Sequence, residues 1–346
     1  MFNRLFVNWC LSRLSKFMKT GELMNTYRQF LFFLIKLALV VGAFYFIYNK
    51  TVHNSSISLN DFVLQLEQTF KTNYKAILIL LIFTFLNWFF EILKWKVLVS
   101  SIKNISVLEA TKQSLGSLTA SLFTPNRIGE YGAKAMCFTK KYRKKIVLLN
   151  LISNISQMLI TVVFGIVGLL FFILNFEVNL PTLKSRKLVY YLLILVIIFL
   201  IGKFFISKKI RGFYLKKIIA FIKKLSKVLV LKTILFSVIR YILFSHQFYF
   251  LLQLFGVETD YFTLMYLIFT MYLIASIIPS LPMFDWLIKG SVAVFIFGFV
   301  GVNELLIVSI TTIMWLLNFA LPSVIGSYFV MSFKVEINEL PTKQSH

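Results

Sequence analysis

The sequence contains little charge, cysteine, histidine, glycine or proline. Only 14% of its 346 residues are charged, whereas an average soluble domain has about 25%. Two cysteines and three histidines are too few for a disulfide framework or a metal cluster, so we expect neither a metal nor another cofactor. The chain is 59% hydrophobic and has no long polar stretch, which excludes a disordered protein and a large water-soluble catalytic domain. The composition therefore predicts an all-α polytopic membrane protein.

Acidic residues are scarce, because 13 Asp and Glu face 37 Lys and Arg, for a formal net charge of +24. In a soluble protein this excess would indicate nucleic acid. In a membrane protein, basic residues collect in cytoplasmic loops and bind anionic lipid headgroups. We therefore expect membrane lipids as partners, either an anionic phospholipid or a lipid-linked substrate. We expect no nucleic acid, since no basic segment forms a polar domain. The sequence leaves open whether the chain forms a homo-oligomer.

Six apolar runs approach or exceed the roughly 20 residues that a spanning helix requires. They are Phe30–Tyr48, Ala76–Leu98, Ile146–Leu174, Leu188–Ile206, Thr233–Leu254 and Leu305–Phe333. Two shorter runs, Val107–Phe123 and Phe262–Ile278, each end at a Pro-containing break that is followed by a second run. Most polar residues on the runs are expected to hydrogen-bond between helices. These residues are Asn87, Asn150, Asn154, Gln157, Gln247 and Asn318.

The loops predict how the chain is oriented. Basic residues cluster at 140–145 and 203–232, whereas the loops at 49–75, 175–187 and 255–261 are weakly charged or acidic. By the positive-inside rule the basic clusters face the cytoplasm. We therefore predict a multi-pass protein of the cell inner membrane with both termini in the cytoplasm.

The N-terminal segment, residues 1–28, is basic and amphipathic, with Phe2, Leu5, Phe6 and Trp9 at helical spacing. This pattern is typical of a helix that lies on the inner membrane surface. The alternative is that translation starts at Met24, which would leave the segment incidental.

The two breaks align with each other without a gap. The first reads ASLFTPNRIGEYGAKA from Ala120, and the second reads ASIIPSLPMFDWLIKG from Ala275, 155 positions later. Each contains an acid, an aromatic residue beside it, and a lysine four residues after the acid. The aligned pairs are Glu130 with Asp285, Tyr131 with Trp286, and Lys134 with Lys289. The flanking apolar runs pair at nearly the same offset.

The chain is therefore predicted to contain two membrane repeats, at 29–180 and 181–333, followed by a cytoplasmic tail at 334–346. Each repeat would have three spanning helices and one re-entrant broken helix. Three crossings invert the second repeat relative to the first, as in many secondary transporters. In the alternative topology both breaks are ordinary loops and 262–278 is a full span.

Ionisable residues within hydrocarbon are costly and are usually functional. The candidate substrate-binding residues are Arg127, Glu130, Lys134, Asp285 and Lys289. The planar fork of Arg127 suits a phosphate. The two acids suit a cationic or hydroxyl headgroup, or a coupled proton. Their i, i+4 spacing to the lysines also permits ion pairs that only hold two hairpins together, which is the structural alternative.

Other residues are expected to shape and support this site. Prolines are expected to break the helices, and glycines to allow close approach of a backbone or a headgroup. These residues are Pro125, Pro279, Pro282, Gly129 and Gly132. Behind them we expect supporting contacts from Tyr131, Trp286, Glu91 and His246, with His246 either a proton relay or a core residue.

The stretch TPNRIGEYGAKA resembles the P-x-R-x-G-E motif of the lysylphosphatidylglycerol synthase transmembrane region, a flippase-like family. The stretch LPSVIGSYF resembles the closing half of the same family, and the resemblance covers roughly residues 30–333. Carried over by motif, the family's residues are Pro125, Arg127, Gly129 and Glu130, with Asp285 added by internal symmetry. The second motif departs from the family because it has no glycine until Gly290 and an Asp in place of a Glu.

The resemblance implies a lipid translocase that lacks the soluble aminoacyl-transferase domain of the bifunctional synthases. No Walker-type phosphate loop is present, so we do not expect an ATPase, and we expect a transporter rather than an enzyme. Three alternatives stay open. They are a secondary transporter of a small solute or ion, a membrane-embedded transferase with Glu130 or Asp285 as general base, and a non-catalytic scaffold.

Overall fold

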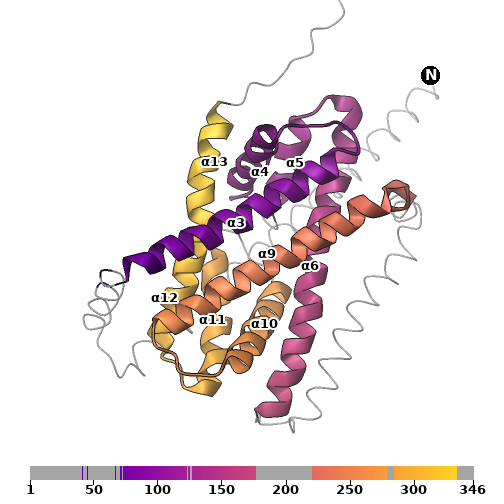
Figure 1. The fold of residues 1–346 in the computed structure, drawn as a ribbon. Helices are drawn as coiled ribbons and strands as arrows, with labels where there is room; N and C mark the ends of the chain where they lie inside the picture. Colours follow the sequence, from indigo (N-terminus) through magenta and orange to yellow (C-terminus); the bar gives the residue numbers. More distant parts are fainter. Residues whose placement is uncertain are drawn as a thin grey trace, which may run out of the picture.

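The computed structural model is helical in the part of the chain that it describes (Figure 1). It describes residues 41, 45, 67, 71, 73–122, 124, 127–176, 220–278 and 284–332. The elements in chain order are α3 (Tyr74–Val99), α4 (Val107–Ser121), α5 (Ile128–Met136), α6 (Lys140–Asn175), α9 (Lys227–Leu254), α10 (Tyr261–Ile277), α11 (Asp285–Phe297), the 3-10 turn η3 (Gly298–Val300), α12 (Glu304–Trp315), the π-helical turn η4 (Leu316–Ala320) and α13 (Leu321–Met331).

Four of these helical stretches are long and apolar enough to cross a membrane, judged by length and composition. They are α3, α6, α9 and the continuous stretch Glu304–Met331. The predicted runs 76–98, 146–174 and 233–254 fall within them, and most of 305–333 does as well, so these helices are confirmed. The two shorter runs also form helices, α4 and α10. Other predicted segments lie outside the described residues, namely 1–28, 30–48 apart from residues 41 and 45, 188–206, 203–219 and 333–346.

Helices from the two halves of the chain pack against each other. α3 packs against α9, α13 lies against α4, and α10 lies against α6 (Figure 1). Each of the last two contacts is close because it contains glycine. A Cβ at Gly326 of α13 would clash with the Leu115 carbonyl oxygen of α4, and a Cβ at Gly168 of α6 would lie 2.7 Å from the Tyr266 carbonyl oxygen of α10. Small residues of this kind allow helices in a membrane to pack closely.

The buried apolar residues form two clusters at opposite ends of the long helices. One cluster joins the C-terminal end of α3 to the N-terminal ends of α6 and α9, around Trp95, Leu149 and Leu229. The other joins the C-terminal ends of α6 and α9 to α10, α11 and α12, around Phe172 and Leu252. Of the charged residues described below, Glu91 of α3 and Arg240 of α9 lie between these clusters along their helices.

Candidate functional site

The turn between α4 and α5 places the first motif. The Gly129 amide donates to Thr124 Oγ1 at 2.9 Å, and a Cβ at Gly129 would clash with the Ala120 carbonyl oxygen. The predicted close approach at Gly129 is therefore present. Arg127 precedes α5 with φ of 57°, and it is the one non-glycine residue with positive φ in the described part of the chain. Such a conformation costs an L-residue about 1–2 kcal/mol, which the packing of the turn must offset.

Glu130 and Lys134 form the predicted i, i+4 ion pair in the interior. Lys134 Nζ donates to Glu130 Oε1 at 2.9 Å and to Asn150 Oδ1 of α6 at 2.8 Å. It also lies 4.3 Å from the centre of the Trp95 ring of α3. Arg127 Nε lies 3.6 Å from the second carboxylate oxygen of Glu130. The two cations therefore share one carboxylate.

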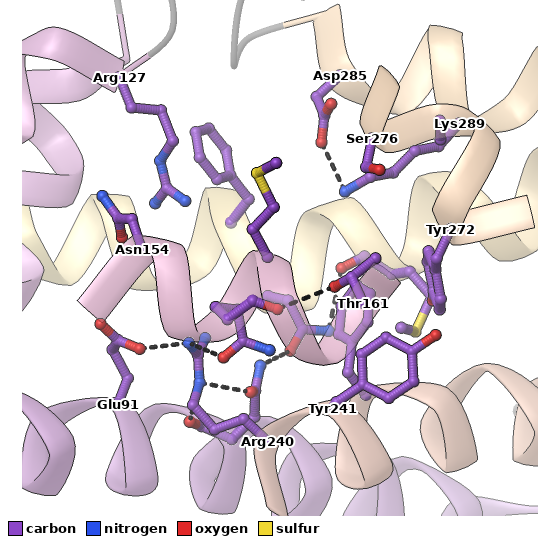
Figure 2. Close-up of a pocket in the computed structure, with 18 of the residues that line it drawn as sticks. Glu91, Arg127, Asn154, Thr161, Arg240, Tyr241, Tyr272, Ser276, Asp285 and Lys289 are labelled. Atoms are coloured by element: carbon purple, nitrogen blue, oxygen red, sulfur yellow. Dashed lines mark hydrogen bonds and ion pairs between the residues drawn. The ribbon is translucent and has the colours of Figure 1, made fainter. Parts of the chain in front are cut away.

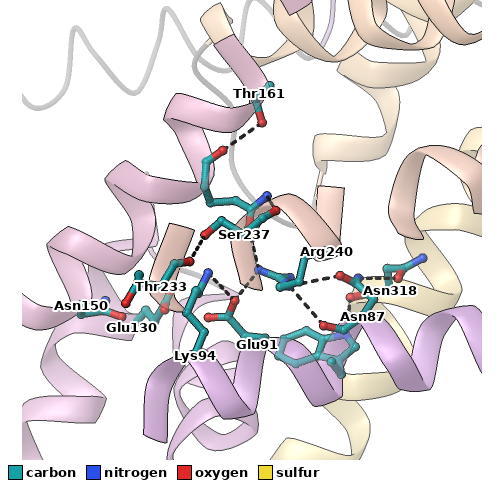
Figure 3. Close-up of polar contacts among 12 residues, drawn as sticks. Asn87, Glu91, Lys94, Glu130, Asn150, Thr161, Thr233, Ser237, Arg240 and Asn318 are labelled. Atoms are coloured by element: carbon teal, nitrogen blue, oxygen red, sulfur yellow. Dashed lines mark hydrogen bonds and ion pairs between the residues drawn. The ribbon is translucent and has the colours of Figure 1, made fainter. Parts of the chain in front are cut away.

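A second charged cluster joins α3 to α9, as Figure 3 shows. Glu91 accepts from Lys94 at 2.7 Å and pairs with Arg240. Arg240 Nε also donates to the backbone oxygen and the Oδ1 of Asn87, both at 3.1 Å, and its Nη1 donates to Gln157 Oε1 at 3.2 Å. Here again two cations share one carboxylate.

A chain of hydrogen bonds between amide side chains continues from this cluster. Asn87 Nδ2 donates to Asn318 Oδ1 at 2.9 Å, and Asn318 Nδ2 donates to Gln247 Oε1 at 2.8 Å. Gln247 then donates to Thr84 Oγ1 at 2.9 Å. Asn318 lies in the π-helical turn η4, so this turn presents its side chain to both α3 and α9. The prediction that these amides bond between helices is confirmed.

The second motif begins α11. Lys289 Nζ pairs with Asp285 Oδ2 at 2.6 Å, and it lies 5.8 Å from the centre of the Phe244 ring. This pair is about one-third exposed, whereas Glu130 and Lys134 are buried. The two motifs therefore form the same pair in different surroundings.

Both motifs line one cavity of about 910 Å³ between the two halves of the chain (Figure 2). In Figure 2, Arg127 and Asp285 lie at one end of the cavity and the Glu91–Arg240 pair lies at the other. The charged residues that line it are Glu91, Lys94, Arg127, Glu130, Lys134, Arg240, Asp285 and Lys289.

Half of the predicted site residues line the cavity. All five candidate substrate-binding residues line it, as do Tyr131 and Glu91. A Cβ at Gly132 would have no protein atom within 4 Å among the described residues, so no backbone approaches there, and the close approach of a headgroup stays a prediction. His246 does not line the cavity and instead bonds to Tyr261 Oη at 2.9 Å. Trp286 also lies outside the lining. The predicted prolines, Pro125, Pro279 and Pro282, lie outside the described residues.

Sequence reasoning did not include Arg240 or Tyr272 among the site residues. Arg240 lies in the middle of an apolar helix, and its cost there was a signal that it needs an acidic partner. Tyr272 lines the cavity beside Met271 and Leu273, and nothing in its local sequence distinguishes it from a core aromatic residue.

Metal-ligating side chains do not gather here. Among the described residues, no group of three or more His, Cys, Asp or Glu side chains is placed to hold a metal ion.

The apolar spanning helices and the charged cavity between them define a multi-pass helical membrane protein. Over residues 33–326 the chain matches the family described as "Lysylphosphatidylglycerol synthase TM region", and it belongs to that family. The family is associated with the handling of membrane phospholipids. Neither the curated proteins nor the solved structures that were searched contain a match to this chain.

Proposed function

We propose that the protein is a lipid translocase, which moves the headgroup of a phospholipid or lipid-linked molecule between leaflets through the cavity. The observation that carries this proposal is a cavity of about 910 Å³ whose described lining has eight charged side chains, enclosed by helices long enough to span a bilayer. A polar headgroup could cross there without entering hydrocarbon, while its acyl chains remain in lipid. Membership of a lipid-handling family supports the same proposal.

The helix packing supports two inverted repeats. α3, α4, α5 and α6 correspond in order to α9, α10, α11 and the stretch Glu304–Met331. The contacts are reciprocal, because α4 of the first set packs on α13 and α10 of the second set packs on α6. α4 has 15 residues and α5 has 9. At 1.5 Å a residue, α4 would be only about 22 Å long, short of the roughly 30 Å hydrocarbon core. A re-entrant hairpin fits these lengths.

The ends of the helices support the predicted orientation. The apolar cluster around Trp95, Leu149 and Leu229 lies at the end where the basic residues 140–145 and 223–232 occur. At the other end, the loop before α10 contains Glu258 and Asp260. We therefore place the basic end in the cytoplasm.

The ion pairs favour a transporter over a transferase. A general base needs a carboxylate that is free to accept a proton at its working pH. Glu130 and Asp285 each have a lysine ammonium within 2.9 Å, which stabilises the ionised form and makes each a poor base. This observation supports binding and guiding of a headgroup.

The proposal is tested by lipid translocation in proteoliposomes, using tail-labelled fluorescent lipids with different headgroups and an impermeant quencher. Removing the ion pair of the first motif by Glu130→Gln/Lys134→Met should abolish the acceleration seen with the native protein. The matched control is Glu67→Gln/Lys71→Met, which removes an exposed i, i+4 pair.

Three results would count against a translocase. One is no acceleration for any headgroup with the native protein. Another is equal loss of activity in the control variant. The third is saturable uptake of a small solute into vesicles that show no lipid movement, which would identify a solute transporter.

A further inference from the structure

The charged groups of the cavity do not balance. Its described lining contains five cationic side chains and three carboxylates, which leaves a surplus of two positive charges. The Glu91 cluster and the Glu130 cluster each contribute one surplus charge. Lys94 and Arg240 share Glu91, and Arg127 and Lys134 share Glu130. Asp285 and Lys289 form a pair that is neutral overall.

The two surplus charges lie in one region. Lys134 of the Glu130 cluster lies 4.3 Å from the centre of the Trp95 ring, and Trp95 directly follows Lys94 of the other cluster on α3. An unbalanced charge is expensive in apolar surroundings, so the region favours a ligand that brings the missing negative charge. A cationic ligand would meet like charge instead.

Neutral hydrogen-bond donors also line the cavity, one on α4 and one on α10. Ser114 Oγ and Tyr272 Oη are buried, line the cavity, and have no hydrogen-bond partner among the described residues. Buried hydroxyl groups are normally paired, and both can donate to a phosphate oxygen. Arg127 and Arg240 add planar guanidinium groups, which bind phosphate well.

We propose that the cavity binds a headgroup carrying two negative charges, either one phosphate monoester or two linked phosphodiesters. This inference rests on the proposed function for its lipid source. The dianionic chemistry itself would be shared by free inorganic phosphate. Its position is between Arg127 at one end of the cavity and Arg240 at the other (Figure 2).

The test is binding to the purified full chain, measured by native mass spectrometry after lipid exchange. The probes are phosphatidic acid and cardiolipin as dianions, phosphatidylglycerol as a monoanion, phosphatidylcholine as a zwitterion, and inorganic phosphate as a soluble competitor. We expect the dianionic lipids to bind about tenfold more tightly than phosphatidylglycerol, and phosphatidylcholine to bind least, as expected for one added charge-assisted contact. Inorganic phosphate should compete only at high concentration.

Variants of Arg127, at one end of the cavity, test whether the surplus positive charge determines the preference for dianions. Arg127→Gln lowers the surplus to one and should reduce the preference for dianions about tenfold, whereas Arg127→Lys keeps the charge and should retain it. Lys141→Gln removes one exposed positive charge outside the cavity lining and should change little. Equal binding of dianions and monoanions, or equal effects of Arg127→Gln and Lys141→Gln, would overturn the inference.

The two proposals fail separately. Dianion preference without lipid translocation would support the charge inference and contradict the translocase. Translocation of phosphatidylglycerol or phosphatidylcholine with no dianion preference would do the reverse. Tight binding of inorganic phosphate with no lipid binding would keep the anion site and overturn its lipid source.

Discussion

Lys134 is about 1% exposed and carries a charge that only its neighbours compensate. Its ammonium contacts Glu130, Asn150 and the Trp95 ring, which belong to three different helices. The pair therefore has a structural role as well as a place in the cavity, and the two roles must be separated by experiment.

Glu130→Gln should destabilise the protein by about 3–5 kcal/mol, because it leaves the Lys134 charge buried without a counter-charge. Glu130→Gln/Lys134→Met should recover most of this loss, since an apolar side chain replaces the unpaired ammonium. Thermal unfolding of the detergent-solubilised protein, followed by size-exclusion chromatography, measures both. A single variant as stable as the native protein would show that the pair contributes nothing to folding.

A change at Arg127 should affect lipid translocation without lowering the stability of the protein. Arg127→Gly removes the conformational cost of its positive φ and should leave the melting temperature equal or slightly higher, by about 1 kcal/mol of stability. The same change removes a cation from the cavity mouth and should slow lipid translocation. Both quantities are measured on one preparation. A large loss of stability would mean that the arginine side chain itself holds the turn.

Among the helices, α4 has the best-defined beginning. Ser106 Oγ accepts from the Glu109 amide at 3.1 Å, and Glu109 Oε2 accepts from the Ser106 amide at 2.7 Å, which forms a capping box. This box starts a helix immediately after the turn that ends α3, and so directs the chain back toward the interior.

The capping box predicts a pH dependence. The Ser106 backbone hydrogen bond holds the pKa of Glu109 below its ordinary value of 4.5. Because the pKa is lower in the folded state, Glu109 stabilises the protein above pH 4.5, and the effect is lost as the pH falls through the folded pKa. Glu109→Gln should therefore lower the melting temperature at pH 7. The difference from the native protein should shrink as the pH falls below 4.5. An equal difference in melting temperature at pH 7 and below pH 4.5 would show that the ionised capping box is not its cause.

The sequence predicted some elements better than others. The break after α4 was readable from Pro125, because proline interrupts helices. The π-helical turn η4 was not predicted, although Pro322 follows it by two residues and has no amide hydrogen to donate to the Asn318 carbonyl. The side chain of Asn318 bonds to residues 231 and 71 positions away, and no local pattern encodes these contacts. The pairing of Arg240 with Glu91 is equally remote in sequence.

For the whole molecule, hydropathy and the internal repeat were sufficient to locate the described spanning helices and to choose the motif residues that line the cavity. They did not predict that α4 would pack on α13. They also did not predict that each of two clusters would hold two cations against one carboxylate. These features depend on which helices meet. They emerge only when both halves of the chain are assembled.

The orientation gives a prediction at this scale. In a Cys10→Ser background, Glu258→Cys should react with an impermeant maleimide applied to intact cells, whereas Ser100→Cys should react only after the membrane is opened. Both positions are exposed. The native Cys137 should react slowly in either case, since burial raises the pKa of its thiol to about 11. The reverse labelling pattern would place the basic end outside.

The contact between α4 and α13 joins two segments that the ribosome synthesises at different times. Thr119 Oγ1 donates to the Ser323 carbonyl oxygen at 2.7 Å, across 204 positions of chain. At about 5–20 residues a second, the ribosome adds the second partner roughly 10–40 s after the first. The face of α4 that packs against Gly326 must therefore stay uncovered until translation is nearly complete. A chaperone or insertase that shields α4 during this interval would meet a need created by the fold itself.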